Sequence, residues 1–146
     1  MGNSPDLSPS RMTEIEKSFA AQSMMHHLGA SLDHVATGAV TVSAPVTADV
    51  RQQHGFAHAG LTFSIGDSAA GYAALSVMPP DTEVLTTEMK INLLAPAQGS
   101  RLEAHGRVIK AGKRLVIVQA DVFSLNDQGG SHIALLTGTM IPVPKK

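Results

Sequence analysis

The segment Gly60–Met78 reads GLTFSIGDSAAGYAALSVM and lacks a polar face of any size. Its large apolar residues are scattered around the helical circumference, and glycine, alanine and serine fill the spaces between them. A helix without a hydrated side is usually surrounded by protein. Pro79 and Pro80 follow the segment and would end the helix. We therefore expect one buried helix over residues 60–78.

Downstream of this helix the hydrophobic period changes from helical to two. Apolar and polar residues alternate there, which is typical of strands with one buried face. Turns are predicted at Gly112 and over residues 126–130. The pattern predicts four long antiparallel strands, at residues 87–96, 102–108, 113–123 and 132–141.

Upstream of the buried helix the sequence predicts a first helix and a hairpin. Residues 13–27 carry an apolar stripe, with Thr13 as N-cap and Glu16 at the spacing of a capping box. Residues 30–36 and 39–47 flank Thr37-Gly38, and the second stretch alternates. We expect these two stretches to pair as a hairpin.

The predicted order of elements is helix, two strands, buried helix and four strands, which places the chain in the α+β class. A strongly twisted antiparallel sheet wrapped around one central helix would bury that helix. We assign residues 13–146 to this single domain and residues 1–12 to a flexible N-terminus. Six strands on one side of a single helix leave an edge and an open face. Homo-oligomerisation is the usual way to cover such surfaces.

The bulk composition is that of a globular protein. Of 146 residues, 43% are hydrophobic and 16% are charged, and the formal net charge is −1 without a block of like charges. These values argue against disorder and against a nucleic-acid surface. The absence of cysteine excludes disulfides and thiolate chemistry. With no signal-peptide pattern and no convincing membrane span, we expect a cytoplasmic protein that does not bind a membrane.

Asp67 is the first candidate for chemistry. It stands midway along an otherwise apolar helix, where an ionised carboxylate is costly unless it is paired or faces a cleft. Either a structural hydrogen-bond network or a catalytic role would explain it. The small residues Ala59 and Gly60 favour catalysis, because they let a ligand approach the free N–H groups at the helix start. Such donors stabilise a developing oxyanion, so the arrangement suits acyl transfer.

The histidines near the helix start admit several interpretations. His58 could be a general base, although we favour a role in capping the helix or orienting the loop. His54 and His58 have the i, i+4 spacing of a metal pair, but Gly55 and Ala57 between them do not suit a helical metal motif and no third ligand is evident. Ser64 lacks the G-x-S-x-G elbow of a serine hydrolase. We expect neither a metal nor a serine nucleophile.

Three motifs keep a spacing that is specific when they are taken together. His58-Ala59-Gly60 followed by Asp67 is similar to an H-G-G-x6-D signature. Residues 86–97, TTEMKINLLAPA, resemble a T-x-x-x-x-x-N-x-L-x-P-A strand, and residues 112–114 resemble a G-K or G-R turn. All three belong to the PaaI-type acyl-CoA thioesterases of the hotdog superfamily, which this chain resembles from about residue 30 to residue 141.

The resemblance implies a hotdog fold, a homodimer with two active sites at its interface, and often a dimer of dimers. It implies that the Asp67 carboxylate attacks the thioester of acyl-CoA or activates water. The N–H of Ala59, with Gly60 beside it, would be the oxyanion donor. Gln52 matches a side chain that orients water or the carbonyl, and Thr86 matches a hydroxyl supplied by the partner subunit. No cofactor is implied.

Two positions depart from the family pattern. The family commonly has glycine where this chain has Ala59, and asparagine where it has Gln52. Alanine keeps the N–H and neither change removes the carboxylate, so we expect acyl-CoA hydrolysis. A non-catalytic acyl-CoA binding or sensor module is the alternative. A hotdog dehydratase is disfavoured, because the motifs H-F-P-G and D-x-N-P-x-H are absent.

The residues that bind the substrate are less sharply indicated. Asn92, Lys113 and Arg114 are candidates for the CoA phosphates or the pantetheine arm, although exposed basic residues are often only solvated. Methionines would suit an adaptable pocket for medium or long acyl chains, or else ordinary core packing. The methionines in question are Met24, Met25, Met89 and Met140.

Overall fold

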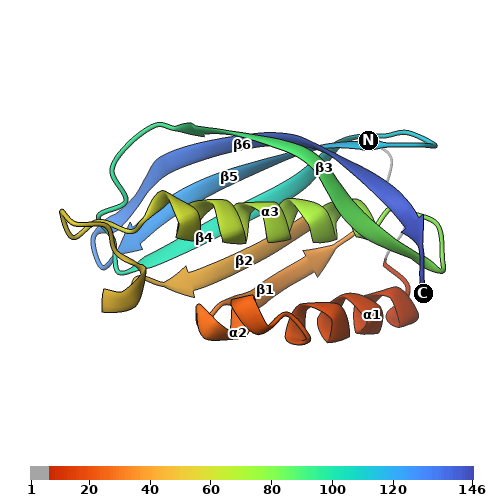
Figure 1. Ribbon diagram of the computed structural model, residues 1–146, viewed down its shortest axis with the longest axis horizontal. Helices are drawn as coiled ribbons and strands as arrows, with labels where there is room; N and C mark the ends of the chain where they lie inside the picture. Colours follow the sequence, from red (N-terminus) through yellow and green to blue (C-terminus); the bar gives the residue numbers. More distant parts are fainter. Residues whose placement is uncertain (1–6) are drawn as a thin grey trace.

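A computed structural model describes residues 7–146. One curved, six-stranded antiparallel sheet holds helix α3 (Ala59–Leu75) against its concave side (Figure 1). The order of strands in the sheet is β1-β2-β4-β5-β6-β3. This arrangement confirms the α+β class and the central helix. The strands are β1 (Ser31–Ala36), β2 (Ala39–Pro45), β3 (Thr82–Leu93), β4 (Arg101–Ala111), β5 (Val116–Asn126) and β6 (Gly129–Pro144).

The small residues of α3 let the sheet approach it closely. A Cβ at Gly106 of β4 would lie 2.2 Å from the carbonyl carbon of Ala69, so only glycine fits there. From Ile65 to Leu75 the helix is buried except at Asp67 and Ser68, which are half-buried. In the first turn Ala59 and Gly60 are exposed while Leu61 and Thr62 are buried, so the expectation of a fully buried helix is wrong at its first residues. No helix within residues 7–146 is both long and apolar enough to cross a membrane.

The alternating strand patterns are confirmed as strands with one face toward α3. In β5, buried and half-buried residues alternate along nearly the whole strand. The predicted hairpin is confirmed as β1 and β2, which pair around Thr37-Gly38. Helix α3 ends at Leu75, three residues before the predicted end at Met78, because the chain turns at Ser76 ahead of the two prolines.

The N-terminal helix differs from its prediction. Two helices form, α1 (Pro9–Ala20) and α2 (Ser23–His27), where one helix from Thr13 was expected. The N-cap is Ser8, whose hydroxyl accepts a hydrogen bond from the N–H of Arg11 at 3.3 Å. Proline at the first helical position has no N–H to leave unpaired, so Pro9 starts this helix without cost. The prediction of a Thr13 cap is therefore wrong.

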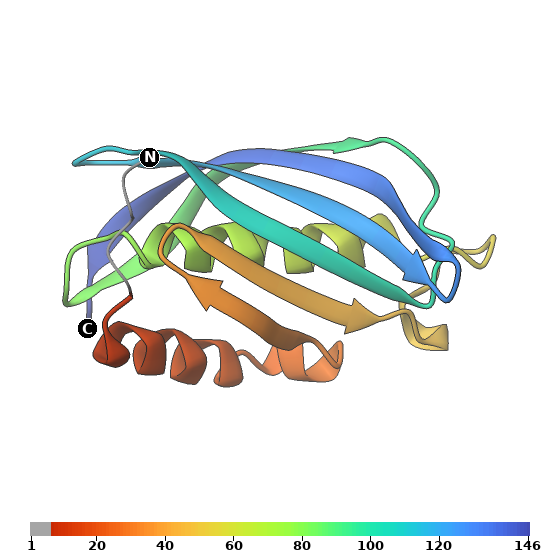
Figure 2. The ribbon, with the colours of Figure 1, turned by 180° about the vertical axis from the view of Figure 1, so that it is seen from behind.

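The start of α1 also corrects the predicted domain boundary. Residues 9–12, which were assigned to a flexible N-terminus, are helical, while residues 1–6 lie outside the part that the structure describes. Ile15 and Phe19 of α1 belong to the core. Both views place α1 alongside the C-terminal half of α3 and α2 near the middle of α3, with both short helices next to β1 (Figure 2).

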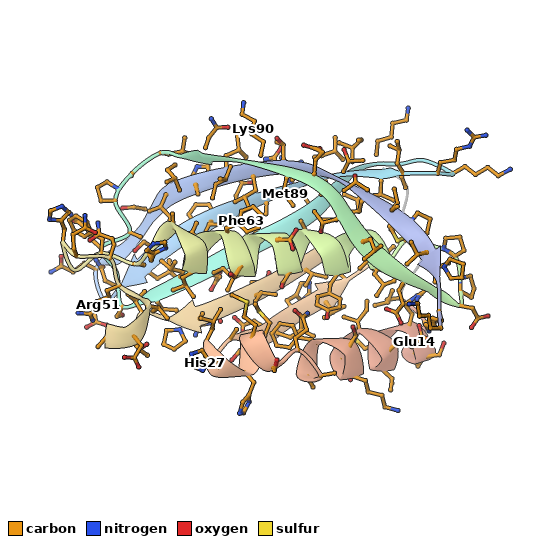
Figure 3. All side chains as sticks on the ribbon, in the orientation of Figure 1. Glu14, His27, Arg51, Phe63, Met89 and Lys90 are labelled. Carbon is orange, nitrogen blue, oxygen red and sulfur yellow. The ribbon has the colours of Figure 1, made fainter. Side chains whose placement is uncertain are left out.

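Strand β3 forms an open edge of the sheet. It pairs with β6 on one side and has no neighbouring strand on the other within residues 7–146. Leu85 and Leu93 on this strand are 53% and 59% exposed. Lys90 points away from α3, while Met89 lies toward it and packs against the core (Figure 3). A long open edge with exposed leucines is a template for pairing with another chain.

Candidate active site

Asp67 lies midway along α3 in the wall of a hollow of about 260 Å³. Burial raises the pKa of the Asp67 carboxyl above its ordinary value, and a hydrogen bond from Thr86 acts in the opposite direction with a smaller effect. The raised pKa makes this carboxylate a better proton acceptor than an exposed aspartate. The hollow is lined by Ser18, Gln22, Asp67, Ser68, Gly71, Tyr72, Glu83, Val84 and Thr86.

The hydroxyl of Thr86 fixes the Asp67 carboxylate. Thr86 Oγ1 donates to Asp67 Oδ1 at 2.8 Å. The pairing of β3 with β6 shifts register between Thr86 and Glu88, so Thr86 stands beside a β-bulge. Bulges of this kind re-aim a side chain next to an active site. Thr86 was expected to serve the site from the partner subunit; within one chain its hydroxyl already contacts the Asp67 carboxylate.

The start of α3 is capped by His58. Its Nδ1 accepts a hydrogen bond from the N–H of Gly60 at 2.8 Å, as expected for a structural cap. A Cβ at residue 60 would lie 3.0 Å from the same Nδ1, so glycine leaves room for the imidazole. The cap occupies the Gly60 N–H. Ala59 is the first helical residue and exposed, and its N–H has no acceptor within the helix.

Gln52 and Ala59 line a second hollow, of about 540 Å³, at the start of α3. The side chain of Gln52 accepts a hydrogen bond from the N–H of His54, which holds the loop before the helix. The backbone N–H of Gln52 also donates to the carbonyl of Phe56 at 2.8 Å. The remaining wall is mostly apolar. It is formed by Phe56, Ala57, Thr62, Leu93, Leu94, Ala95, Pro96, Ala97 and Ile133.

The expected catalytic groups fall into two pairs that one chain does not bring together. Asp67 meets Thr86 at the first hollow, and Ala59 meets Gln52 at the second. Ala59 and Asp67 are eight residues apart on one helix, which corresponds to about 12 Å along its axis. One thioester carbonyl cannot touch both groups at this separation.

The expected substrate-binding residues lie outside both hollows. Asn92 is exposed on β3, next to Leu93. Lys113 and Arg114 are exposed in the turn between β4 and β5. This turn lies toward the C-terminal end of α3, away from the N-terminal end of that helix (Figure 1). The structure therefore does not bring the basic turn to either pair.

Two further sequence hypotheses can be compared with the geometry. Within residues 7–146, no group of three His, Cys, Asp or Glu side chains is placed to hold a metal ion. The four methionines proposed for an acyl pocket line neither hollow. Met25 and Met140 are buried in the core, and Met24 is 56% exposed.

A polar cluster beside Asp67 was missed from the sequence. Gln22 Nε2 donates to the hydroxyl of Tyr72 at 2.6 Å, and the hydroxyls of Ser18 and Tyr72 are 3.1 Å apart. All three residues line the hollow that holds Asp67. A signal was available, because Tyr72 is the only tyrosine of the chain and stands in an apolar helix, where its hydroxyl needs a polar partner.

Comparison with known proteins assigns the family. The chain matches the Thioesterase superfamily over residues 54–131. The protein belongs to the thioesterase superfamily. The crystal structure of a thioesterase family protein from Silicibacter pomeroyi is 37% identical and superposes with a TM-score of 0.90, covering 92% of this chain and 99% of that chain.

Two other relatives bear on the fold and the enzyme class. The PaaI protein of E. coli is 23% identical, with a TM-score of 0.83 over 96% of this chain and 98% of that chain. A 1,4-dihydroxy-2-naphthoyl-CoA hydrolase of Listeria monocytogenes is 30% identical over 86 residues, which are 59% of this chain and 70% of the relative. The hotdog fold and the resemblance to PaaI-type thioesterases are confirmed. This member of the thioesterase superfamily is a thioester hydrolase.

Proposed function

We propose that this thioesterase hydrolyses acyl-CoA to a free carboxylic acid and CoA, with Asp67 as the catalytic carboxylate. The proposal is carried by the 2.8 Å hydrogen bond from Thr86, which holds the half-buried carboxylate in the wall of a hollow. A carboxylate with a raised pKa is suited to act as base or nucleophile. The name of the Listeria relative, a CoA-thioester hydrolase, supports a CoA thioester as the substrate class.

Each active site is proposed to be shared by two copies of the chain. The hollow of Asp67 touches β3 at Thr86, and the hollow of Ala59 touches the same strand at Leu93. If two β3 edges pair antiparallel about a twofold axis between Met89 and Lys90, Thr86 of one copy faces Leu93 of the other. That pairing joins the carboxylate of one copy to the free N–H of the other. It also covers the open edge.

The chemistry then needs few groups. The Asp67 carboxylate takes a proton from water as the water oxygen attacks the thioester carbon, or it attacks that carbon itself and water cleaves the resulting anhydride. The carbonyl oxygen becomes negative against the N–H of Ala59 from the second copy. Collapse of the tetrahedral intermediate expels the CoA thiolate, which then takes up a proton. A thiol with a pKa of roughly 8.5 leaves without a strong general acid.

The remaining expected residues take supporting roles in this proposal. Gln52 stands beside Ala59 and would orient water or the carbonyl, while His58 holds the helix start. Asn92, Lys113 and Arg114 stay proposed contacts for the pantetheine arm and the phosphates of CoA. We propose a homodimer, with a dimer of dimers as its further assembly, in the cytoplasm.

Release of free thiol from a panel of acyl-CoAs tests the proposal. We expect turnover by the wild type and a fall in kcat of about a thousandfold in Asp67→Asn, which keeps an acceptor for Thr86 but loses the base. Circular dichroism checks that the variant folds. An Asp67→Asn protein as active as the wild type would remove Asp67 from catalysis. Tight binding of acyl-CoA with no thiol release by the wild type would instead support a binding or sensor module.

A further inference from the structure

The hollow beside Asp67 ends in a polar cluster that the proposed chemistry does not use. Ser18 and Gln22, at the end of α1 and just after it, meet Tyr72 of α3 there. The Tyr72 ring packs on Phe19, with 6.0 Å between ring centroids, and Tyr72 is only 5% exposed. The packing fixes the position of the hydroxyl. The cluster is thus a rigid polar end to the hollow.

The break between α1 and α2 turns the Gln22 side chain toward the cluster. Gln22 stands at the N-cap of α2, yet its side chain makes no capping hydrogen bond. Its amide instead donates to the Tyr72 hydroxyl at 2.6 Å. A continuous helix from α1 into α2 would place this side chain elsewhere.

The hydrogen-bonding capacity of the cluster is not used up. Ser18 and Tyr72 share one hydrogen bond, and only one of the two hydroxyls can be its donor. The hydrogen of the other hydroxyl has no acceptor among residues 7–146, and Gln22 Oε1 has no donor there. The cluster can therefore both donate to and accept from one further polar group.

The charges around the hollow restrict what that group can be. Asp67 and Glu83 line it with carboxylates, and none of its lining residues is Lys, Arg or His. A ligand that ends in a carboxylate would be repelled at this end. A neutral hydroxyl is not repelled, and it can accept from the free hydroxyl hydrogen while donating to the Gln22 amide oxygen.

The geometry also indicates which part of the substrate, the acyl group or the CoA arm, enters the hollow beside Asp67. Tyr72 lies five residues after Asp67, about 7.5 Å further along the helix axis. An acyl group whose carbonyl carbon lies at Asp67 can extend over that length toward Tyr72. The nucleotide of CoA has to reach solvent, whereas Ser18 of α1 and Gln22 just after it form part of the wall of this hollow. The acyl arm is the one that fits.

On the basis of the proposed function, we infer that Tyr72, Gln22 and Ser18 form the specificity pocket for the far end of the acyl group, and that the preferred substrates are short acyl-CoAs with a neutral hydroxyl at that end. Glu83 acts against acyl groups that end in a carboxylate. The hollow of about 260 Å³ limits the acyl group to a compact one.

Three acyl-CoAs of equal length test the inference: omega-hydroxyhexanoyl-CoA, hexanoyl-CoA and adipoyl-CoA. We expect kcat/KM to be about tenfold higher for the hydroxylated substrate than for hexanoyl-CoA, as one or two neutral hydrogen bonds would give, and lowest for adipoyl-CoA. Tyr72→Phe and Gln22→Leu should each lower the ratio of hydroxylated to plain substrate toward one. Gln128→Leu, in the exposed turn between β5 and β6, makes the same change elsewhere and should leave the ratio unaltered.

Dissociation constants of the same three acyl-CoAs, measured on Asp67→Asn protein, report the preference for the hydroxylated acyl group in the absence of hydrolysis. Hydrolysis of all three at equal efficiency, or a ratio that survives both substitutions, overturns the specificity pocket and leaves the thioesterase proposal intact. If the wild type releases no thiol but the dissociation constants keep the expected order, the hydrolysis proposal fails and the pocket stands. A flat order of dissociation constants would overturn the pocket as well.

Discussion

The two hollows along α3 differ in both size and chemistry. The one beside Asp67, of about 260 Å³, is lined mostly by polar side chains, whereas the one at the start of the helix, of about 540 Å³, is lined mostly by apolar ones. The first holds a carboxylate and the second an exposed backbone N–H at Ala59. Thioester cleavage needs both groups at one carbonyl, yet about 12 Å of helix separates them. The comparison supports the proposal that two copies of the chain complete each active site.

After Asp67→Asn, the largest effect on this division is expected from Ala59→Pro. Proline is well tolerated at the first helical position, and His58 already has the extended backbone, with ψ of 142°, that a residue before proline adopts. The substitution removes the N–H without disturbing the helix. Loss of one oxyanion donor should lower kcat by about a hundredfold, with an unchanged melting temperature as the check on folding. Wild-type activity in this variant would exclude Ala59 as the donor.

Mixing two inactive variants would decide whether the halves belong to one copy or two. In a heterodimer of Asp67→Asn with Ala59→Pro, one of the two shared sites contains both an intact Asp67 and an intact Ala59. The other site carries both substitutions. Half of randomly assembled dimers are such heterodimers. Random assembly should therefore restore about a quarter of the wild-type activity. Sites contained within single chains would stay inactive in every dimer. Thiol release from co-refolded mixtures, compared with each variant alone, gives the answer.

The next largest effect is expected from Thr86→Val. This substitution changes the polar hollow of Asp67 and leaves the lining of the apolar hollow unchanged. The Thr86 hydrogen bond lowers the pKa of Asp67, which burial raises, so its removal should raise that pKa further. Only the ionised carboxylate is active, so activity rises with pH through the Asp67 pKa. The acid limb of kcat/KM should move to higher pH in the variant, with kcat about tenfold lower because the carboxylate is less well held.

Thr87→Val is the matched control for this measurement. Thr87 is the neighbour of Thr86 on β3, but its hydroxyl donates to the carbonyl of Thr139 at 2.9 Å and does not reach Asp67. Its acid limb should coincide with that of the wild type. An acid limb that moves to lower pH in Thr86→Val, or that moves equally in both variants, would contradict the assigned hydrogen bond.

The sequence predicts the fold well where one local pattern decides it. The lack of a polar face predicts the buried helix α3, and the alternation of apolar and polar residues predicts the long strands. Both patterns are local, because burial selects the apolar positions of each element separately. The position of β3 beside β6 has no such local signature. The start of α1 is not predicted, because the polar composition of residues 1–12 favours a flexible N-terminus, although Ser8 and Pro9 are both favourable at a helix start.

The candidate site was predictable residue by residue but not as an arrangement. Asp67 stood out because a carboxylate is costly in an apolar helix. Its bond with Thr86 could be inferred only through the resemblance, which matched Thr86 to a hydroxyl supplied by the partner subunit. The cluster of Gln22 and Tyr72 depends on the helix break at Ala21, and no hydrophobic period marks that break.

The smallest effect concerns the start of α3 and the histidine that caps it. His58→Ala removes the acceptor for the Gly60 N–H and should lower the free energy of unfolding by about 1 kcal/mol in urea denaturation, as the loss of an N-cap does. His58→Asn supplies a capping oxygen at the same place and should restore the stability.

The pair of variants also separates capping from catalysis. If His58 only orders the helix start, kcat/KM recovers in His58→Asn together with stability, because the Ala59 N–H is again held in place. If the imidazole is the base, stability returns but the rate does not, since an amide cannot take a proton near neutral pH. A general-base histidine would place proton transfer at the start of α3 and leave Asp67 to hold the substrate, reversing the roles proposed for these two residues.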